Sequence, residues 1–392
     1  MAESWFRARI MVAFLALWAA SAAAANDIIE IAYLGVQTQR PPVLATLDRS
    51  PDDPGIAGAQ TALAELNTAG VFLGQVYRLK TVTVPVGEDP LEAAEQLLDA
   101  TRLLVLDAPA EVLTAIADLP AAQGALLFNT SSGDPSLRND ACRSNLLHTI
   151  PSTAMRTDAL AQFFLSRRRT DFVMISGKHA IDQSYAASVR RSLQKFGLTL
   201  KAEKTWDFNA GMRRSAAAEM PLFTQDFGDY DTLIVADEVH DFGRYVMYNT
   251  WQARPVAGSE GLTPVTWSPV IEDWGAVQLQ RRFEKLTGRG MTSGDYAAWA
   301  ALRVIGEAVS RTGSADPLGL RDYILSDAFE IAGFKGRPLT FRTWNGQLRQ
   351  PIALTHPRGL VASVPLEGFM HQTNALDTLG FDRPESTCAL FR

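Results

Sequence analysis

The sequence is poor in the residues and motifs on which most catalytic sites depend. It has 2 cysteines and 5 histidines among its 392 residues. It contains no Gly-x-Ser-x-Gly elbow, no His-Glu-x-x-His zinc motif and no glycine-rich phosphate loop of the Gly-x-Gly-x-x-Gly or Walker type. These absences argue against a hydrolase, a metalloprotease and a nucleotide-dependent enzyme. We therefore expect a protein that is not an enzyme and that holds no cofactor or metal.

Positive charge is also scarce. Lysine and arginine total 37 against 43 aspartate and glutamate residues, which gives a net charge of −6. A short basic run at residues 166–169 stands where a helix is predicted to end, and helix ends favour cations. Nucleic-acid-binding proteins normally carry a basic patch, so we expect no nucleic-acid partner.

Long hydrophobic runs are absent except near the N-terminus. Arg7 and Arg9 precede an apolar stretch at residues 10–20, and small residues follow as far as Ala25. This pattern is typical of a cleaved signal peptide (residues 1–25), and the apolar stretch is too short to span a bilayer. No cysteine lies near the cleavage site, which argues against a lipid anchor. The sequence thus predicts export to the periplasm, with no membrane span in the mature chain.

The two cysteines are Cys142 and Cys388. In an oxidising compartment an even number of cysteines favours a disulfide, which would tie the C-terminal end of the chain to its middle. Two buried free thiols are the alternative.

Strand and helix patterns alternate through most of the chain. The predicted strands are residues 27–36, 76–84, 103–106, 125–128, 171–176 and 231–236. The predicted helices include residues 55–70, 89–100, 110–118, 273–286 and 293–311. This order predicts mainly parallel sheets with helices on both faces. Near the C-terminus, Asn345-Gly346 between two alternating segments predicts a β-hairpin.

The alternation restarts near residue 150, where Ser152 is a plausible helix N-cap. We therefore predict an α/β fold with two Rossmann-like lobes, a hinge and a cleft between the lobes. Lobe 1 would comprise residues 26–150 and 271–340, and lobe 2 residues 151–270 and 341–392. The hinge would pass near residues 149–152 and 268–272 and through the hairpin region after Gly336. Ligands of open α/β sheets bind beyond the carboxyl ends of the strands.

Five small or polar residues give the chain a resemblance to a known family. They are Gly58, Ala62, Asn67, Gly70 and Gly74 in "GIAGAQTALAELNTAGVFLG". This spacing resembles type I periplasmic binding proteins, the leucine/isoleucine/valine-binding-protein-like receptors of ABC transporters. The segments "FNTSSGDPSLR", "HTIPSTAMRTDALAQFF" and "DYAAWAALRVIGEAV" are also similar to that family. The resemblance implies a small-molecule ligand, hinge closure and an ABC permease as partner.

A narrower resemblance lies in the second half of the chain. The segments "CRSNLLHTIPS", "FGRYVMYNTWQARPVAGSEGL", "RGMTSGDYAAWAALR" and "LDTLGFDRPESTC" look like binding proteins associated with PQQ-dependent alcohol dehydrogenase systems. This likeness implies a role in periplasmic alcohol catabolism, but it does not imply that the chain itself binds PQQ. Both cysteines fall inside these segments, which supports their pairing.

One loop departs from the family pattern. Amino-acid receptors of this class follow the third strand with a Gly-x-x-Ser-Ser type loop that holds the ligand carboxylate. Here that place reads "LDAPAE", residues 106–111. Pro109 has no amide hydrogen and Asp107 would repel a carboxylate. A neutral, cationic or metal-bearing ligand therefore fits better than an α-amino acid.

The predicted ligand-binding residues follow strands in both halves of the chain. They are Asp107, Thr130, Ser131, Ser132, Tyr185, Asp237 and Glu238. Each has a structural alternative: residues 129–134 are common turn formers, and Asp182 or Ser184 near Tyr185 could cap a helix. His240 and Asp241 are predicted to begin the next helix, with Asp241 as its cap or first-turn acid.

Two other functions remain open. One is a sensory or scaffold protein of the alcohol-oxidation system that keeps the binding-protein fold, and the altered loop at residues 107–111 is its best support. The other is a receptor for calcium or a lanthanide that uses Asp107, Asp237 and Glu238, since carboxylate oxygens suit hard cations. The spacing does not follow the calcium-loop pattern, and neighbouring strand residues point to opposite faces.

Overall fold

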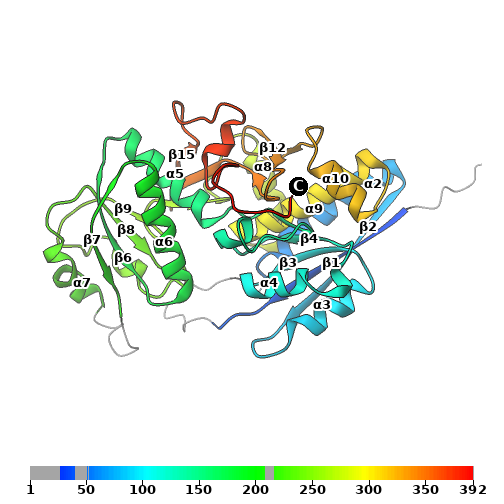
Figure 1. The fold of residues 1–392 in the computed structure, drawn as a ribbon, viewed down its shortest axis with the longest axis horizontal. Coiled ribbons are helices and arrows are strands. Elements are labelled where there is room, and N and C mark those ends of the chain that lie inside the picture. Colours follow the sequence, from blue (N-terminus) through cyan, green and yellow to red (C-terminus); the bar gives the residue numbers. More distant parts are fainter. Residues whose placement is uncertain (1–26, 40–50, 52, 208–215, 392) are drawn as a thin grey trace, which may run out of the picture.

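Two parallel sheets, each covered by helices on both faces, make up most of the molecule in a computed structural model (Figure 1). The structure describes residues 27–39, 51, 53–207 and 216–391, so the predicted signal peptide lies outside the described residues. Within these ranges no helix has the length and hydrophobicity needed to cross a membrane. The predicted two-lobed α/β fold is confirmed.

The sheet of lobe 1 has five parallel strands in the order β2-β1-β3-β4-β5. These strands are β1 (Asp27–Val36), β2 (Gln75–Val84), β3 (Leu103–Asp107), β4 (Leu126–Asn129) and β5 (Leu146–His148). One face packs against α2 (Ile56–Leu73), α8 (Ala276–Thr287), α9 (Ser293–Thr312) and α10 (Pro317–Ile324). The other face packs against α3 (Pro90–Leu98) and α4 (Ala110–Ala117).

Strand β1 shows why both faces of this sheet are covered. Ile29, Ile31 and Tyr33 lie in the core beneath α2 and α9. Ala32 and Leu34 lie in the core beneath α3 and α4. Successive side chains of a strand point to opposite faces, so a strand that is apolar at nearly every position needs helices on both sides.

The sheet of lobe 2 has the order β7-β6-β8-β9, again all parallel. Its strands are β6 (Asp171–Ser176), β7 (Thr199–Thr205), β8 (Thr232–Ala236) and β9 (Val256–Gly258). Helices α5 (Thr153–Ser166) and α6 (Ala180–Lys195) cover one face, and α7 (Ala216–Thr224) covers the other. The Ser152 hydroxyl accepts the backbone N–H of Met155, so the predicted N-cap of α5 is confirmed.

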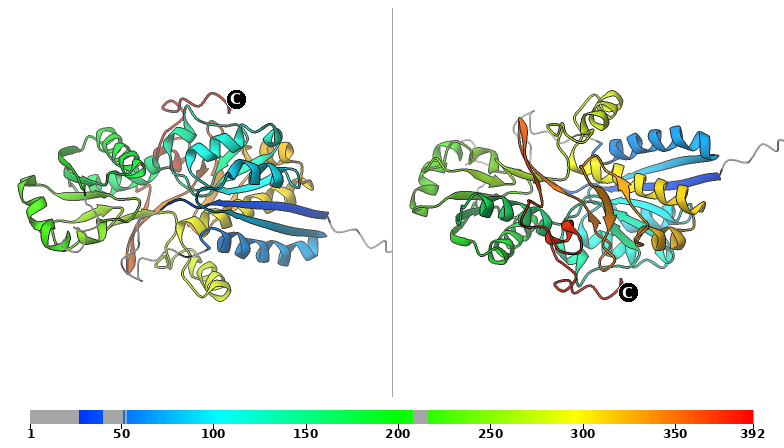
Figure 2. Two further views of the ribbon diagram at one scale, coloured as in Figure 1. Left: turned by 90° about the horizontal axis from the view of Figure 1, so that it is seen from below. Right: turned by 90° about the horizontal axis from the view of Figure 1, so that it is seen from above.

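Antiparallel strands lie where the lobes meet, and Figure 2 shows the long β14–β15 hairpin between them. One small sheet has the order β10-β14-β15 and the other the order β11-β12-β13. Their strands are β10 (Thr263–Val265), β11 (Ile331–Ala332), β12 (Pro338–Phe341), β13 (Leu348–Arg349), β14 (Ile352–His356) and β15 (Gly359–Val364). Short 3-10 helices occur at η2 (Pro120–Ala122), η3 (Pro135–Arg138), η5 (Gln225–Phe227), η6 (Gly243–Tyr245) and η7 (Ala375–Thr378).

The predicted hairpin around Asn345-Gly346 is present, but it is shorter than the pattern suggested. It joins β12 to β13, and Gly346 has a φ of 66°. After β13 the chain changes partner, because β14 pairs with β10 and β15 instead. The segment 341–392 therefore contacts both lobes: β14 and β15 contribute to the lobe 2 core, whereas Phe391 lies in the lobe 1 core.

The disulfide between Cys142 and Cys388 is confirmed, with Cα atoms 5.7 Å apart and a sequence separation of 246. It fastens the end of the C-terminal tail to lobe 1.

One predicted helix boundary is wrong. The helix predicted to stop at Gly70 continues to Leu73, and Gly74 ends it with a φ of 66°. Gly70 serves a different purpose, because a Cβ there would lie 2.3 Å from the carbonyl oxygen of Gln75. The glycine allows α2 to lie directly against the start of β2.

Candidate ligand-binding site

The predicted ligand-binding residues lie at or near the carboxyl ends of strands in the two sheets. In lobe 1 they follow β3 and β4, which are adjacent parallel strands. In lobe 2 Asp237 and Glu238 follow β8, and Tyr185 lies on α6, the helix after β6. Because all strands within each sheet are parallel, these loops gather at one edge of their sheet, where open α/β sheets bind ligands.

In lobe 1 the loop after β4 is organised by Asn129. Its side-chain oxygen accepts the backbone N–H groups of Ser131 and Ser132, at 3.1 and 2.9 Å. Thr130 is buried and donates to the carbonyl oxygen of Leu106. Ser131 is exposed, and its hydroxyl oxygen accepts the N–H of Ala108 at 2.9 Å. Of the three predicted residues in this loop, Ser131 is exposed, Ser132 is partly exposed and Thr130 is buried.

Asp107 lies at the end of β3, where it is partly exposed. The Tyr33 hydroxyl lies 3.3 Å from the Asp107 carboxylate and is oriented to donate to it. Burial, followed by the negative charge of Asp107, raises the pKa of Tyr33 well above its ordinary value. Tyr33 therefore stays a neutral donor beside the end of β3.

In lobe 2 Asp237 is fully buried and holds the turn that follows β8. Its carboxylate accepts three backbone N–H groups, from Asp241 at 2.9 Å, Phe242 at 2.8 Å and Gly243 at 2.6 Å. A carboxylate with both oxygens engaged in this way stabilises the turn, and solvent does not reach it. In this structure Asp237 is thus placed as a support for the loop.

The α-helix predicted to begin at His240 and Asp241 is wrong. The chain forms an irregular turn instead, with His240 at a φ of 57°, followed by the single 3-10 turn η6. The physical reason is Asp237, which lies a few residues before the place predicted for the cap and draws three successive amides into a tight turn. Asp241 donates its N–H to this carboxylate and is not the cap.

Glu238 is engaged by Arg156, an arginine of α5. The two guanidinium N–H groups of Arg156 donate to the two carboxylate oxygens of Glu238, at 2.5 and 3.1 Å. The Ser259 hydroxyl donates to Glu238 as well, at 2.8 Å. Burial would raise the pKa of Glu238, but Arg156 and Ser259 outweigh burial and leave that pKa lowered. Glu238 is therefore ionised at neutral pH and paired.

Tyr185 lies beside the same ion pair. It is fully buried, and the Arg156 guanidinium carbon lies 5.0 Å from its ring centroid, within cation–π range. Its hydroxyl has no hydrogen-bond partner among the described residues. Tyr185 and Glu238 thus both contact Arg156. Asp237 instead binds backbone amides of the turn.

Arg156 is the residue of this region that sequence reasoning missed. It lies 82 residues before Glu238 in the sequence. The one available signal was its position near the start of a helix with many buried residues. A charged side chain in such a place requires a partner, because buried charges are normally paired.

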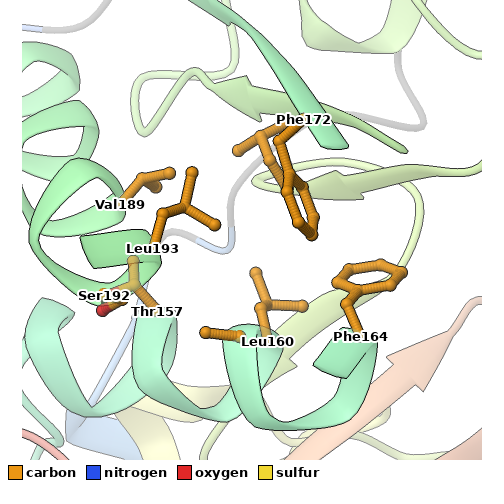
Figure 3. Close-up of a pocket in the computed structure, with 9 residues that line it drawn as sticks. Thr157, Leu160, Phe164, Phe172, Val189, Ser192 and Leu193 are labelled. Carbon is orange, nitrogen blue, oxygen red and sulfur yellow. Dashed lines mark hydrogen bonds between the residues drawn. The ribbon is translucent and has the colours of Figure 1, made fainter. Parts of the chain in front are cut away.

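Two observations limit the alternatives at this site. First, a small cavity in lobe 2 lies among Leu160, Phe164, Phe172 and Leu193 (Figure 3), but its volume of about 10 Å³ could hold no more than a water molecule. Second, the described residues contain no group of three or more His, Cys, Asp or Glu side chains that could hold a metal ion. The geometry therefore offers the metal-receptor hypothesis no support.

Asp182 is expected to make the stability of the protein depend on pH. It is fully buried and accepts the N–H of Glu238 at 2.7 Å and that of His179 at 3.3 Å, so it takes part in capping α6. Burial, and then the charge of Asp237, raise the pKa of Asp182 to about 6. A raised carboxyl pKa means that the folded state binds more protons than the unfolded state between pH 4 and pH 6.

We therefore expect the free energy of unfolding to fall as pH rises from 4 to 6, by about 2–3 kcal/mol from this group, and then to level off. The difference between wild type and Asp182→Asn, measured by urea unfolding at several pH values, isolates this contribution. In Asp182→Asn the free energy of unfolding should not show the decline that Asp182 causes between pH 4 and pH 6. Parallel pH curves for the two proteins would contradict the assignment.

Comparisons with known proteins agree with this architecture. A sequence profile of the family described as "Periplasmic binding protein" matches residues 48–219. Among proteins with curated functions, none matches this sequence.

Three solved structures illustrate the likeness. A branched-chain amino acid ABC transporter periplasmic ligand-binding protein from Burkholderia xenovorans has a TM-score of 0.71 and 15% identity, with 93% of this chain and 100% of that chain covered. An ABC transporter substrate-binding protein from Desulfitobacterium hafniense, in complex with Leu, has a TM-score of 0.61 and 17% identity over 86% and 99% of the chains. A solute-binding protein from R. palustris, in complex with benzoate, has a TM-score of 0.63 and 13% identity over 93% and 100%. The chain therefore has the type I periplasmic binding protein fold.

Proposed function

We propose that this chain is a member of the periplasmic binding protein family and serves as the substrate-binding component of an ABC transporter. It would be exported to the periplasm, hold a small molecule between the polar loops at the carboxyl ends of β3 and β4 and those of β6 and β8, and present it to a membrane permease. The observation that carries the proposal is the pair of parallel sheets with polar strand ends, in a fold that three solved binding proteins share over most of their length. Closure of the two lobes would bury the ligand and mark the loaded state.

The ligand that fits best is a neutral or cationic small molecule. One feature of lobe 1 that disfavours an anion there is that the amide of Ala108 is already used by Ser131. Pro109 cannot donate a hydrogen bond at all. The relatives that were solved with Leu and benzoate carry a carboxylate on their ligands, so the substrate class of this chain would differ from theirs.

A thermal-shift screen of residues 26–392 tests the proposal. The panel contains short alcohols, their aldehydes and acids, amines, amino acids, PQQ, calcium and a lanthanide ion. A ligand at about 100 times its dissociation constant adds roughly 2.7 kcal/mol, which raises the melting temperature by several degrees for a chain of this size. A hit among the alcohols, aldehydes or amines supports the proposal, and a carboxylate hit that is lost in Ser131→Ala contradicts the assigned ligand class.

A variant at Asp107 locates the site. If the hit is a cation, Asp107→Asn should weaken its binding at least tenfold, because a hydrogen bond to a charged group contributes about 1.5–3 kcal/mol. The matched control is Asp99→Asn, which should leave the affinity unchanged, since Asp99 is an exposed aspartate at the C-terminal end of α3, before the start of β3. Isothermal titration calorimetry measures both. Equal affinities for the two variants would place the cation elsewhere.

The finer assignment to PQQ-dependent alcohol oxidation rests on sequence resemblance alone. This assignment predicts that the ligand found in the thermal-shift screen is an alcohol or its aldehyde, and that PQQ itself does not bind.

A sensory or scaffold role is the second candidate, and one observation favours it. The acidic residues after β8 are already satisfied internally, Asp237 by backbone amides and Glu238 by Arg156. A flat response across the whole panel would favour this second role over transport.

A further inference from the structure

A second cavity lies at the joint between the lobes, away from the strand ends discussed above. Its volume is about 270 Å³, which suits a small ligand. Trp274, Lys335 and Arg337 line one side, from the loops before α8 and between β11 and β12. Pro351 and Ser363 line the other side, from the segments around β14 and β15. The cavity thus joins elements that pack on different lobes.

Two cations line this cavity without a carboxylate to balance them. Lys335 is buried, and its ammonium group donates to three neutral oxygens, on Thr266, Gln350 and Pro351. Its ammonium also lies 4.6 Å from the Tyr296 ring centroid. No Asp or Glu among the described residues lies within ion-pair distance of either Lys335 or Arg337. Burial lowers the pKa of Lys335 well below its ordinary value.

Burial thus disfavours the protonated form of Lys335, and an anion bound in the cavity would favour that form. Moving an ammonium group out of water is unfavourable, and buried charges are therefore normally paired. Arg337 is exposed, and its one hydrogen bond to a described side chain is a weak contact with the Met370 sulfur at 3.9 Å. Most of its N–H donors thus remain available to a ligand.

The backbone around the cavity is also strained. Trp274 has a φ of 56° and Phe334 a φ of 54°, a left-handed conformation that costs a bulky residue roughly 1–2 kcal/mol. Gly336 lies under the Trp274 indole, because a Cβ on Gly336 would be 2.6 Å from the indole nitrogen. Such strain persists only where the surroundings enforce it, and it concentrates at functional sites.

We propose that this cavity binds a small oxyanion, a phosphate or carboxylate group, through Arg337 and the positive field of Lys335. The Trp274 indole N–H and the Ser363 hydroxyl supply further neutral donors along the lining. A bound anion would stabilise the protonated form of Lys335, in a place that both lobes help to form. This site does not depend on the proposed transport function, because its residues take no part in the strand-end loops.

Calorimetric titration of the mature chain with inorganic phosphate and with citrate tests the proposal, with sodium chloride at matched ionic strength as the reference. We expect saturable binding of at least one of the two anions, and the stronger of them identifies phosphate or carboxylate as the preferred group. Arg337→Gln should weaken binding about tenfold. Arg358→Gln is the matched control, since Arg358 is an exposed arginine in the turn of the same β14–β15 hairpin, and it should bind as wild type does.

Two further variants sharpen the test. Lys335→Met removes the buried amine and should abolish binding, and urea unfolding of the unliganded variant shows whether its fold is kept. Ser131→Ala alters the strand-end site and should leave anion binding unchanged. Wild-type affinity in Arg337→Gln, loss of binding in Ser131→Ala, or phosphate and citrate responses equal to that of chloride would each overturn the proposal.

Discussion

Replacing Arg156 by methionine is expected to lower the free energy of unfolding by about 3 kcal/mol or more, because it leaves the Glu238 carboxylate largely buried without its partner. The side chains of Arg156 and Glu238 are 22% and 13% exposed, and both carboxylate oxygens are occupied by the guanidinium group. Arg156 also donates to the carbonyl oxygen of Pro264 in β10. The pair therefore links α5, the turn after β8 and the joint between the lobes. Urea unfolding followed by circular dichroism measures the change.

The matched control is Arg78→Met, which breaks an exposed pair with Glu30. The side chains of that pair are 59% and 46% exposed, so the loss should stay below about 1 kcal/mol. The double variant Arg156→Met, Glu238→Leu should recover much of the stability, since apolar residues of similar size replace a buried pair at little cost. If Arg156→Met cost no more than Arg78→Met, the Glu238 carboxylate would have to reach solvent in solution.

Much of the fold could be predicted from the sequence because the central strands of both sheets are nearly continuous apolar runs. Strand β1 and strand β6 have the bounds that were predicted, residues 27–36 and 171–176. A run that is apolar at every position implies burial on both faces, and therefore helices on both sides. The βαβ rhythm then implies parallel strands, which in turn indicate the edge at which ligands bind.

The site itself was less predictable, because side-chain direction depends on contacts between distant residues. Asp237 and Glu238 are neighbours in the sequence, yet one caps a turn and the other pairs with Arg156 from a different helix. Local pattern indicated that the segment is acidic and follows a strand, but it could not show which amides or cations would reach it. The cavity that contains Lys335 was likewise invisible, because its lining comes from segments as far apart as residues 274 and 365.

Removing the disulfide by the double change Cys142→Ser, Cys388→Ser should lower the free energy of unfolding by about 2–5 kcal/mol, since the bond closes a very long loop. The sequence separation of 246 places the expected loss of stability at the upper end of this range, because the chain-entropy model assigns more stabilisation to a longer loop. Near this point the tail is also attached by the Ser386 hydroxyl, which donates to the carbonyl oxygen of Arg138, and by the N–H of Thr387, which donates to the side-chain oxygen of Asn139. Thermal unfolding with and without dithiothreitol measures the effect, and the reductant should change wild type but not the variant.

The loss should extend beyond the tail, because Phe391 packs on the turn of the β12–β13 hairpin. A Cβ on Gly346 would lie 2.6 Å from the Phe391 ring, so the glycine and the ring are in direct contact. Freeing the tail removes Phe391 from the lobe 1 core and exposes this turn to solvent. Hydrogen exchange should therefore accelerate at residues 342–348 in the variant and remain unchanged in the β7–β6–β8 sheet of lobe 2. Uniform acceleration in both lobes would mean that the bond stabilises the whole chain through the unfolded state alone, without a local role in holding the tail on the hairpin.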